Sequence, residues 1–124
     1  MNERLISSNR QVREITTTIP SGQTETEAIP MGQKVIGVSA PTSYTHVLTY
    51  LEPVSGLEGT ALKLHAGITP EVMQVLKDDG EDVVIEGGSK IPVEITFGIP
   101  YIKFVASQAQ AATRTVKIVL AQFD

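Results

Sequence analysis

Prolines and glycines divide the whole sequence into short segments. The prolines stand at positions 20, 30, 41, 53, 70, 92 and 100, and further turns are marked by Asp79-Gly80, Gly87-Gly88 and Gly98. Proline donates no ladder hydrogen bond, so in β structure it belongs at the ends of strands. Turn signals spaced by roughly 8–12 residues are typical of an all-β sandwich or barrel. This spacing constrains the fold more than any other feature of the chain.

The segments between the turns have the patterns of strands. Ile15, Thr17 and Ile19 alternate with Thr16 and Thr18, a β-branched run with a period of two. Further strands are predicted at residues 24–29, 34–40, 46–52, 61–66, 71–77, 82–86, 92–97, 101–107 and 113–123. Antiparallel pairing of these strands in a sandwich is the expected architecture, with residues 107–113 as its most mobile loop.

One segment fits either a strand or a short helix. Thr69 could cap a helix that begins at Pro70, and apolar residues at helical spacing follow. However, Asp79-Gly80 comes directly afterwards and is a strong hairpin signal. A strand is therefore favoured, and a helix over residues 70–77 is the alternative.

The chain is long enough for one domain. At 124 residues it can build a single hydrophobic core. Residues 1–11 are polar and charged and are predicted to form a flexible N-terminal arm, followed by a single β-sandwich domain over residues 12–124. Such arms are usually disordered alone, and the alternative is an arm that orders on a partner.

Composition argues against several classes of function. The chain has no cysteine, which removes disulfides, thiolate nucleophiles and cysteine-based metal sites. Its formal net charge of −4 disfavours non-specific binding to nucleic acid. No run approaches the roughly 20 apolar residues of a membrane-spanning helix, and residues 1–11 lack the apolar core of a secretory signal. We therefore expect a soluble, acidic protein with no nucleic-acid or membrane partner.

No catalytic, metal-binding or cofactor-binding constellation is predicted. His65 shares the solvated face of its strand with Lys63, His46 opens another strand, and neither is expected to bind a metal or act as a general base. The acids of residues 78–82 are contiguous and their glycine comes third, so they fit a hairpin turn rather than a calcium loop. No serine stands in a G-x-S-x-G elbow. We expect no enzyme activity, cofactor or small-molecule substrate, and a small hydrolase is the weakest alternative.

The last predicted strand is apolar on both faces. Val119, Ala121 and Phe123 alternate with Ile118 and Leu120, although a sandwich has only one inner face per sheet. The apolar surplus predicts protein–protein contact, with Val119, Ala121 and Phe123 as the expected self-association residues. The alternative explanation is an incorrect strand register.

The order of these segments resembles a family of virion proteins. The chain contains, in succession, TIPSGQTETEAIPMGQKVIGVSAP, GLEGTALKLHAGIT, the hairpin LKDDGEDVVI, IPYIKFVAS and QAQAATRTVKIVL. Over residues 15–120 this succession resembles the head decoration, or cement, proteins of tailed bacteriophages. One departure is GITPEVMQVL, which lacks the aromatic residue expected in that strand. The resemblance implies an all-β fold, an antiparallel and jelly-roll-like β-sandwich.

The resemblance also implies a structural role. Cement proteins lie on the outside of an icosahedral head, often as dimers or trimers, and bridge neighbouring major capsid protein subunits. The expected function is that of a virion structural protein, made in the host cytoplasm, which stabilises the capsid from its outer surface. A homodimer is expected, with a trimer as the alternative. Arg4, Arg10 and Arg13 are the expected capsid contacts, through an arm that meets an acidic capsid surface.

The alternative function is a carbohydrate-binding or tail-associated adhesion module. A β-sandwich commonly carries such sites, but a fold alone does not give a function. Sugar binding favours exposed aromatic residues, and the candidates in this chain are Tyr44, Tyr50 and Tyr101.

Overall fold

The computed structural model describes residues 12–32 and 46–122, and within these ranges it is built of strands joined by turns. The strands are β1 (Val12–Ile19), β2 (Ile29–Pro30), β3 (His46–Leu51), β4 (Leu62–Thr69), β5 (Val72–Val75), β6 (Lys77–Asp78), β7 (Glu81–Asp82), β8 (Val84–Ile85), β9 (Ser89–Lys90), β10 (Tyr101–Val105) and β11 (Arg114–Gln122). Every strand pair is antiparallel. The predicted all-β class is therefore confirmed. The strand predicted at residues 34–40 lies outside the described residues.

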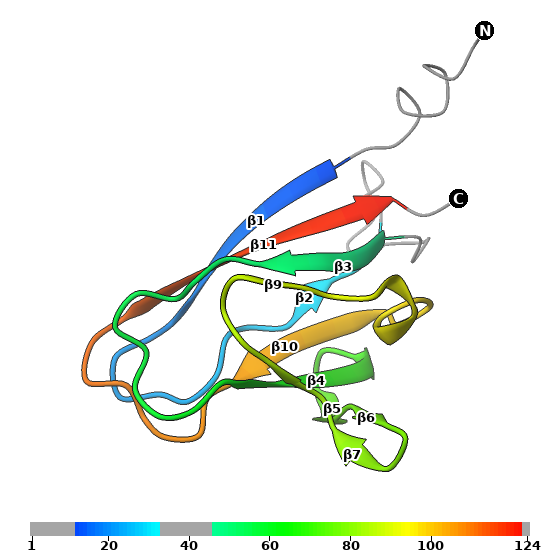
Figure 1. Ribbon diagram of the computed structural model, residues 1–124. Helices are drawn as coiled ribbons and strands as arrows, with labels where there is room; N and C mark the ends of the chain where they lie inside the picture. The colour runs from blue at the N-terminus through cyan, green and yellow to red at the C-terminus, as the bar shows by residue number, and fades with distance from the viewer. Residues whose placement is uncertain (1–11, 33–45, 123–124) are drawn as a thin grey trace, which may run out of the picture.

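Two main sheets form the two layers of a sandwich (Figure 1). The first sheet has the strand order β1-β11-β3-β9, and the second has the order β2-β10-β4-β5 with β8 also paired to β4. The short β6–β7 hairpin forms a separate ribbon. From β1 to β4, and again from β9 to β11, the chain crosses from one sheet to the other at each step. The layers are thus held together by connections as well as by their core.

The core lies between the inner faces of the two sheets. Ile118 and Leu120 of β11 and Ile102 and Phe104 of β10 are fully buried in one apolar cluster. Each of these residues alternates along its strand with a more accessible one. Such alternation is what a strand with one buried face requires, and Ile118 and Leu120 lie opposite Val119 and Ala121, as the sequence of the last strand predicts.

The turn at Asp79-Gly80 joins two strands as predicted. Asp79 has a φ of 57° and Gly80 a φ of 82°, and the neighbouring residues Asp78 and Glu81 pair directly. Positive φ at both central residues is the mark of a type I′ hairpin turn. The acidic run of residues 78–82 is this hairpin. The segment before it, residues 70–77, contains strand β5, so the prediction of a strand rather than a helix is confirmed.

The strand predicted at residues 92–97 is wrong. These residues form a turn with the 3-10 helix η1 (Val93–Ile95), in which the N–H of Ile95 donates to the carbonyl of Pro92 (3.1 Å). Thr96 is fully buried, and its hydroxyl accepts a hydrogen bond from the Leu48 amide (2.8 Å). The Thr96 side chain therefore accepts from β3 a hydrogen bond that the backbone carbonyl of a neighbouring strand would otherwise accept.

No helix in the described part of the chain has the length and apolar character needed to cross a membrane.

The strand predicted at residues 24–29 is mostly irregular. It pairs through an isolated bridge between Glu25 and Val105 and then through β2. Between these points Thr26 is buried, and its hydroxyl accepts a hydrogen bond from the Phe104 amide (3.1 Å). Here too a threonine oxygen takes the place of a backbone carbonyl, so the ladder is interrupted although the segment stays beside β10.

Candidate functional site

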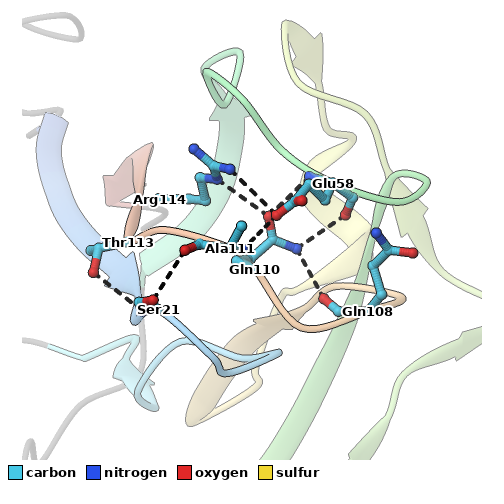
Figure 2. Close-up of polar contacts among 7 residues, drawn as sticks. All are labelled: Ser21, Glu58, Gln108, Gln110, Ala111, Thr113 and Arg114. Atoms are coloured by element: carbon cyan, nitrogen blue, oxygen red, sulfur yellow. Dashed lines mark hydrogen bonds and ion pairs between the residues drawn. The ribbon is translucent and has the colours of Figure 1, made fainter.

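Three loops meet at one end of the sandwich. They comprise residues 20–24 after β1, residues 52–61 after β3 and residues 106–113 before β11, and they lie together at the left of Figure 1. Gln110, which is only 2% exposed, lies between them. Figure 2 shows its side-chain amide at the centre of the polar contacts that join the loops. Side-chain hydrogen bonds therefore join the three loops at this end of the sandwich, which is called the loop end below.

Every polar atom of the Gln110 side chain is used. Its Oε1 accepts from the Glu58 amide (2.9 Å), and its Nε2 donates to the carbonyls of Glu58 (3.0 Å) and Gln108 (2.9 Å). Its backbone amide donates to the Gln23 carbonyl (3.1 Å), and its carbonyl accepts from the Gly22 amide (2.7 Å). A buried polar group must be bonded in this way to avoid a desolvation penalty. Gln110 thus connects all three loops.

An ion pair lies against this amide. The Glu58 carboxylate accepts from the Ala111 amide and from Nη2 of Arg114 (3.3 Å), while Nε of Arg114 also donates to Oε1 of Gln110 (3.4 Å). The Ala111 amide first, and the Arg114 guanidinium after it, hold the pKa of the Glu58 carboxyl below its ordinary value of 4.5 against the opposing effect of desolvation. Gly56 has a φ of 75°, and a Cβ there would lie 2.6 Å from Nη1 of Arg114. The loop can therefore carry only glycine at this point without displacing the guanidinium.

These contacts argue against the mobility predicted for residues 107–113. Besides the bonds of Gln110, the Ser21 hydroxyl donates to the carbonyl of Ala111 (3.2 Å), and the Ser21 amide donates to the hydroxyl of Thr113 (3.2 Å). No sequence signal separates the buried Gln110 from the exposed Gln108. The distinction comes from partners more than 50 positions away in the chain.

The residues exposed at the loop end are small or polar, and none of them is charged. Its exposed residues are Pro20, Ser21, Gly22, Gln23, Pro53, Ser55, Gly56, Gly59, Thr60, Ser107, Gln108, Ala109, Ala111, Ala112 and Thr113. The charges of Glu58 and Arg114 neutralise each other beneath it. Rigid loops lose little entropy on binding, and small hydroxyl and amide groups adapt their hydrogen bonds to a partner. The loop end is suited to contact with a polar protein surface.

We expect acid to destabilise the protein partly through Glu58. Because its pKa is lowered in the folded state, its contribution is fully present above the ordinary pKa and is lost as the pH falls through the folded value. Urea unfolding at about pH 7, pH 5 and pH 3 should show falling stability, with a smaller fall in Glu58→Gln. Glu71→Gln, which changes an exposed carboxyl at the β4–β5 turn, is the matched control. Equal pH dependence in all three proteins would contradict the assignment.

Arg13, predicted in the flexible arm, belongs to the first sheet. It lies in β1 opposite Leu120, and its Nη1 donates to the Gly32 carbonyl (3.2 Å). Directly opposite residues share a sheet face, so Arg13 is on the core side of β1. The assignment to the arm is wrong because the β ladder already begins at Val12. Arg4 and Arg10 lie outside the described residues, and capsid contact by all three arginines stays a prediction.

An apolar strip runs along the outer face of the first sheet. Val119 pairs with Glu14 and Ala121 pairs with Val12; Val119 and Ala121 are half-buried, and Val12 is 66% exposed. We call Val12, Val119 and Ala121 the outer strip. Val119 and Ala121 alternate with the buried core residues of β11. An incorrect register therefore does not explain the apolar surplus of this strand. Phe123 lies outside the described residues.

The outer face of the second sheet carries paired charges. Lys103 pairs with Glu25 (3.0 Å), and Asp82 pairs with Lys63 (3.0 Å) and Lys77 (2.9 Å). His65 stands opposite Lys103, and desolvation, followed by the charge of Lys103, lowers its pKa. Exposed pairs of this kind contribute little stability. The ion pairs link β7 to β4 and the loop before β2 to β10.

The remaining chemically interesting residues are dispersed. His46 is buried at the start of β3, and Tyr101 is buried in β10. Tyr50 is half-buried beside Val119, and Tyr44 lies outside the described residues. Within residues 12–32 and 46–122, no three histidine, aspartate or glutamate side chains come together in a group that could hold a metal ion.

No protein-family model, no curated protein and no solved structure matches the chain. The fold and the two surfaces described above define its class, an antiparallel β-sandwich with a hydrogen-bonded loop end and an apolar outer strip. Any assignment of function must therefore be argued from these surfaces and from the connectivity of the strands.

Proposed function

We propose that this protein is a virion structural protein, a head decoration or cement protein of a tailed bacteriophage. The observation that carries the proposal is the strand order. Sheets β1-β11-β3-β9 and β2-β10-β4-β5, with the chain crossing between them at most steps, support a jelly-roll-like connectivity. Double-sheet jelly rolls are the architecture of many viral capsid and lectin domains. Because one fold serves many functions, the surfaces must carry the rest of the argument.

Both surfaces favour contact with other protein molecules. The outer strip combines the exposed Val12 with the half-buried Val119 and Ala121 on the solvent side of the sheet, and exposed apolar patches mark interaction sites. The loop end is held in one arrangement by Gln110, which lowers the cost of ordering it on a partner. On a shell with many copies, weak contacts of this kind act together through a high effective concentration.

The proposed partner is the major capsid protein, bound at the outer surface of the head after synthesis in the host cytoplasm. The N-terminal arm, with Arg4 and Arg10, would contact an acidic capsid surface, and Arg13 would position the start of the arm. The outer strip, together with Phe123, would contribute to self-association in a homodimer, with a trimer as the alternative. The proposal includes no nucleic acid, membrane or small-molecule substrate.

The structure gives less support to the alternative function, a carbohydrate-binding or tail-associated adhesion module. Tyr101 is only 9% exposed, and it lies on the face of β10 opposite to the core residues Ile102 and Phe104. Among the described tyrosines this leaves Tyr50, which is half-buried beside Val119. A single partly accessible ring is a weak platform for a sugar, and we do not propose this function.

The test is co-sedimentation with empty shells assembled from the major capsid protein encoded in the same genome. We expect saturable binding that weakens about tenfold, or about 1.4 kcal/mol, in the double variant Arg4→Ala/Arg10→Ala. The double variant Lys63→Ala/Lys77→Ala removes the same charge from the outer face of the second sheet, away from the arm and the outer strip, and is the matched control.

Absence of binding by the folded wild-type protein would overturn the proposed function. Equal weakening in both double variants would overturn the role of the arm, because it would show a general effect of net charge. Binding of the wild-type protein should also weaken with added salt, since exposed charges are screened.

A further inference from the structure

The edge of β1 away from β11, called its free edge below, is unusual among the sheet edges in residues 12–32 and 46–122. β1 is eight residues long, whereas β5 has four, β9 has two, and β2 has two and contains Pro30. Its ladder with β11 runs through all eight positions without a bulge. Proteins usually blunt exposed edges by shortness, proline, charged residues or a bulge; β1 has no proline, lysine or bulge, and its charged residues are Arg13 and Glu14, both near its start. Within the described residues its neighbour is β11 alone.

The hydrogen bonds of β11 establish which β1 residues face outward. The Glu52 amide donates to the Lys117 carbonyl (2.9 Å), so the backbone groups of Lys117 point toward the side of β3. In an antiparallel ladder the backbone groups of successive residues point to opposite sides. The backbone groups of Val116 and Ile118 therefore point toward β1.

Their partners in β1 are Thr17 and Ile15. Odd-numbered residues of β1 thus exchange hydrogen bonds with β11, and even-numbered residues direct their N–H and C=O groups to the free edge. The outward set comprises Val12, Glu14, Thr16 and Thr18. Three of these four residues are β-branched, which suits a strand interior.

We propose that β1 pairs antiparallel with β1 of a second copy, with Ile15 opposite Ile15, so that the two four-stranded sheets join into one. This inference rests on the proposed self-association and names the element that performs it. In this register Glu14 faces Thr16 of the second copy and Val12 faces Thr18. All four outward residues then form hydrogen-bonded pairs.

The neighbouring symmetric registers are less favourable. A ladder centred on Glu14 would place two carboxylates directly opposite each other, which is destabilising. A ladder centred on Thr16 would place Val12 opposite Pro20, which has no N–H to donate. The register centred on Ile15 avoids both conflicts.

Both faces of the joined sheet support this register. Ile15 is half-buried and packs against the core cluster, so two facing Ile15 side chains would extend the two cores toward each other. On the outer face Thr16 stands beside Lys117. Glu14 would therefore share a cross-strand row with Lys117 of the second copy, and their charges are opposite.

The joined sheet also has a consequence for bridging. Pro20 and the loop end follow β1 directly, and the second copy would run antiparallel. The two loop ends would therefore lie at opposite ends of the dimer. A dimer built in this way presents two rigid polar surfaces to two neighbouring capsid subunits, as a bridging protein requires.

Because the chain has no cysteine, disulfide cross-linking of single variants tests the pairing directly. Ile15 would lie in a non-hydrogen-bonded pair, where Cα atoms are about 4.5 Å apart, within the range that a disulfide spans. We expect oxidised Ile15→Cys to form a covalent dimer at least ten times faster than Thr17→Cys, the matched inward-facing control. Thr17 would face Arg13 of the second copy and not another cysteine.

Light scattering on the wild-type protein and on Thr16→Pro provides a second measurement. The Thr16 amide points to the free edge, so proline there spares the β11 ladder and should weaken the dimer at least tenfold, whereas Thr16→Ala should not. Faster cross-linking of Thr16→Cys than of Ile15→Cys would overturn the register. A dimer insensitive to Thr16→Pro would overturn β1 pairing, and a wild-type monomer at high concentration would overturn self-association as well. Capsid binding is measured separately by co-sedimentation, so failure of the dimer and failure of the proposed function can be distinguished.

Discussion

Phe104→Ala should lower the free energy of unfolding by about 3–5 kcal/mol, the range observed when a buried aromatic residue is truncated. Phe104 is fully buried in the core cluster, and it is the largest of the fully buried side chains in the described residues. Its removal takes away apolar burial and leaves a cavity that the two sheets can close only in part. Because domains are stable by only about 5–15 kcal/mol, the midpoint of thermal unfolding should fall by roughly 10–20 °C.

Phe97→Ala is the matched control for this prediction. Phe97 lies in the turn after η1 and is 58% exposed, so its truncation should cost less than about 1 kcal/mol. Urea unfolding followed by circular dichroism measures both variants. Similar losses from the two substitutions would show that the space between the sheets is not the main source of stability.

Gln110→Ala should cost about 2–3 kcal/mol and loosen the loop end. The substitution removes the partners of the Glu58 amide and of the Glu58 and Gln108 carbonyls. Backbone groups that lose a buried partner carry a desolvation penalty unless water reaches them. Hydrogen exchange measured by mass spectrometry should therefore become faster in residues 20–24, 52–61 and 106–113, while β3 and β10 keep their protection.

Two further variants test the role of the amide itself. Gln108→Ala removes an exposed side chain and keeps the carbonyl that accepts from Gln110, so it should have little effect. Gln110→Glu should be worse than Gln110→Ala, because a carboxylate oxygen would then face the Glu58 and Gln108 carbonyls. Equal stability of Gln110→Ala and Gln108→Ala would contradict the role of Gln110 in connecting the three loops.

Local chemistry made several elements predictable. The Asp79-Gly80 turn follows from the ability of aspartate and glycine to adopt positive φ, which a tight hairpin requires. The inward faces of β10 and β11 follow from the two-residue period of their apolar side chains. Both signals are contained within a few neighbouring residues, so the sequence is sufficient to read them.

The two incorrect strand predictions share one physical cause. Residues 92–97 and 24–29 have the composition of strands, but the hydroxyls of Thr96 and Thr26 accept hydrogen bonds from Leu48 and Phe104. A side-chain oxygen that replaces a backbone partner stops the ladder without changing the apolar pattern. The burial of Gln110 also cannot be read from the local sequence, because its partner Glu58 is 52 positions away.

The sequence by itself therefore determined the β class, the main turns and the faces of the longest strands, because these depend on local backbone preferences and on side-chain alternation. Tertiary structure decided which strands are neighbours, that Arg13 is part of a sheet, and that β1 is left as a long edge. The pairing of strands distant in the chain depends on contacts across the whole core, and no local pattern encodes them. The loop end and the edge of β1, on which the proposed contacts depend, are products of that pairing.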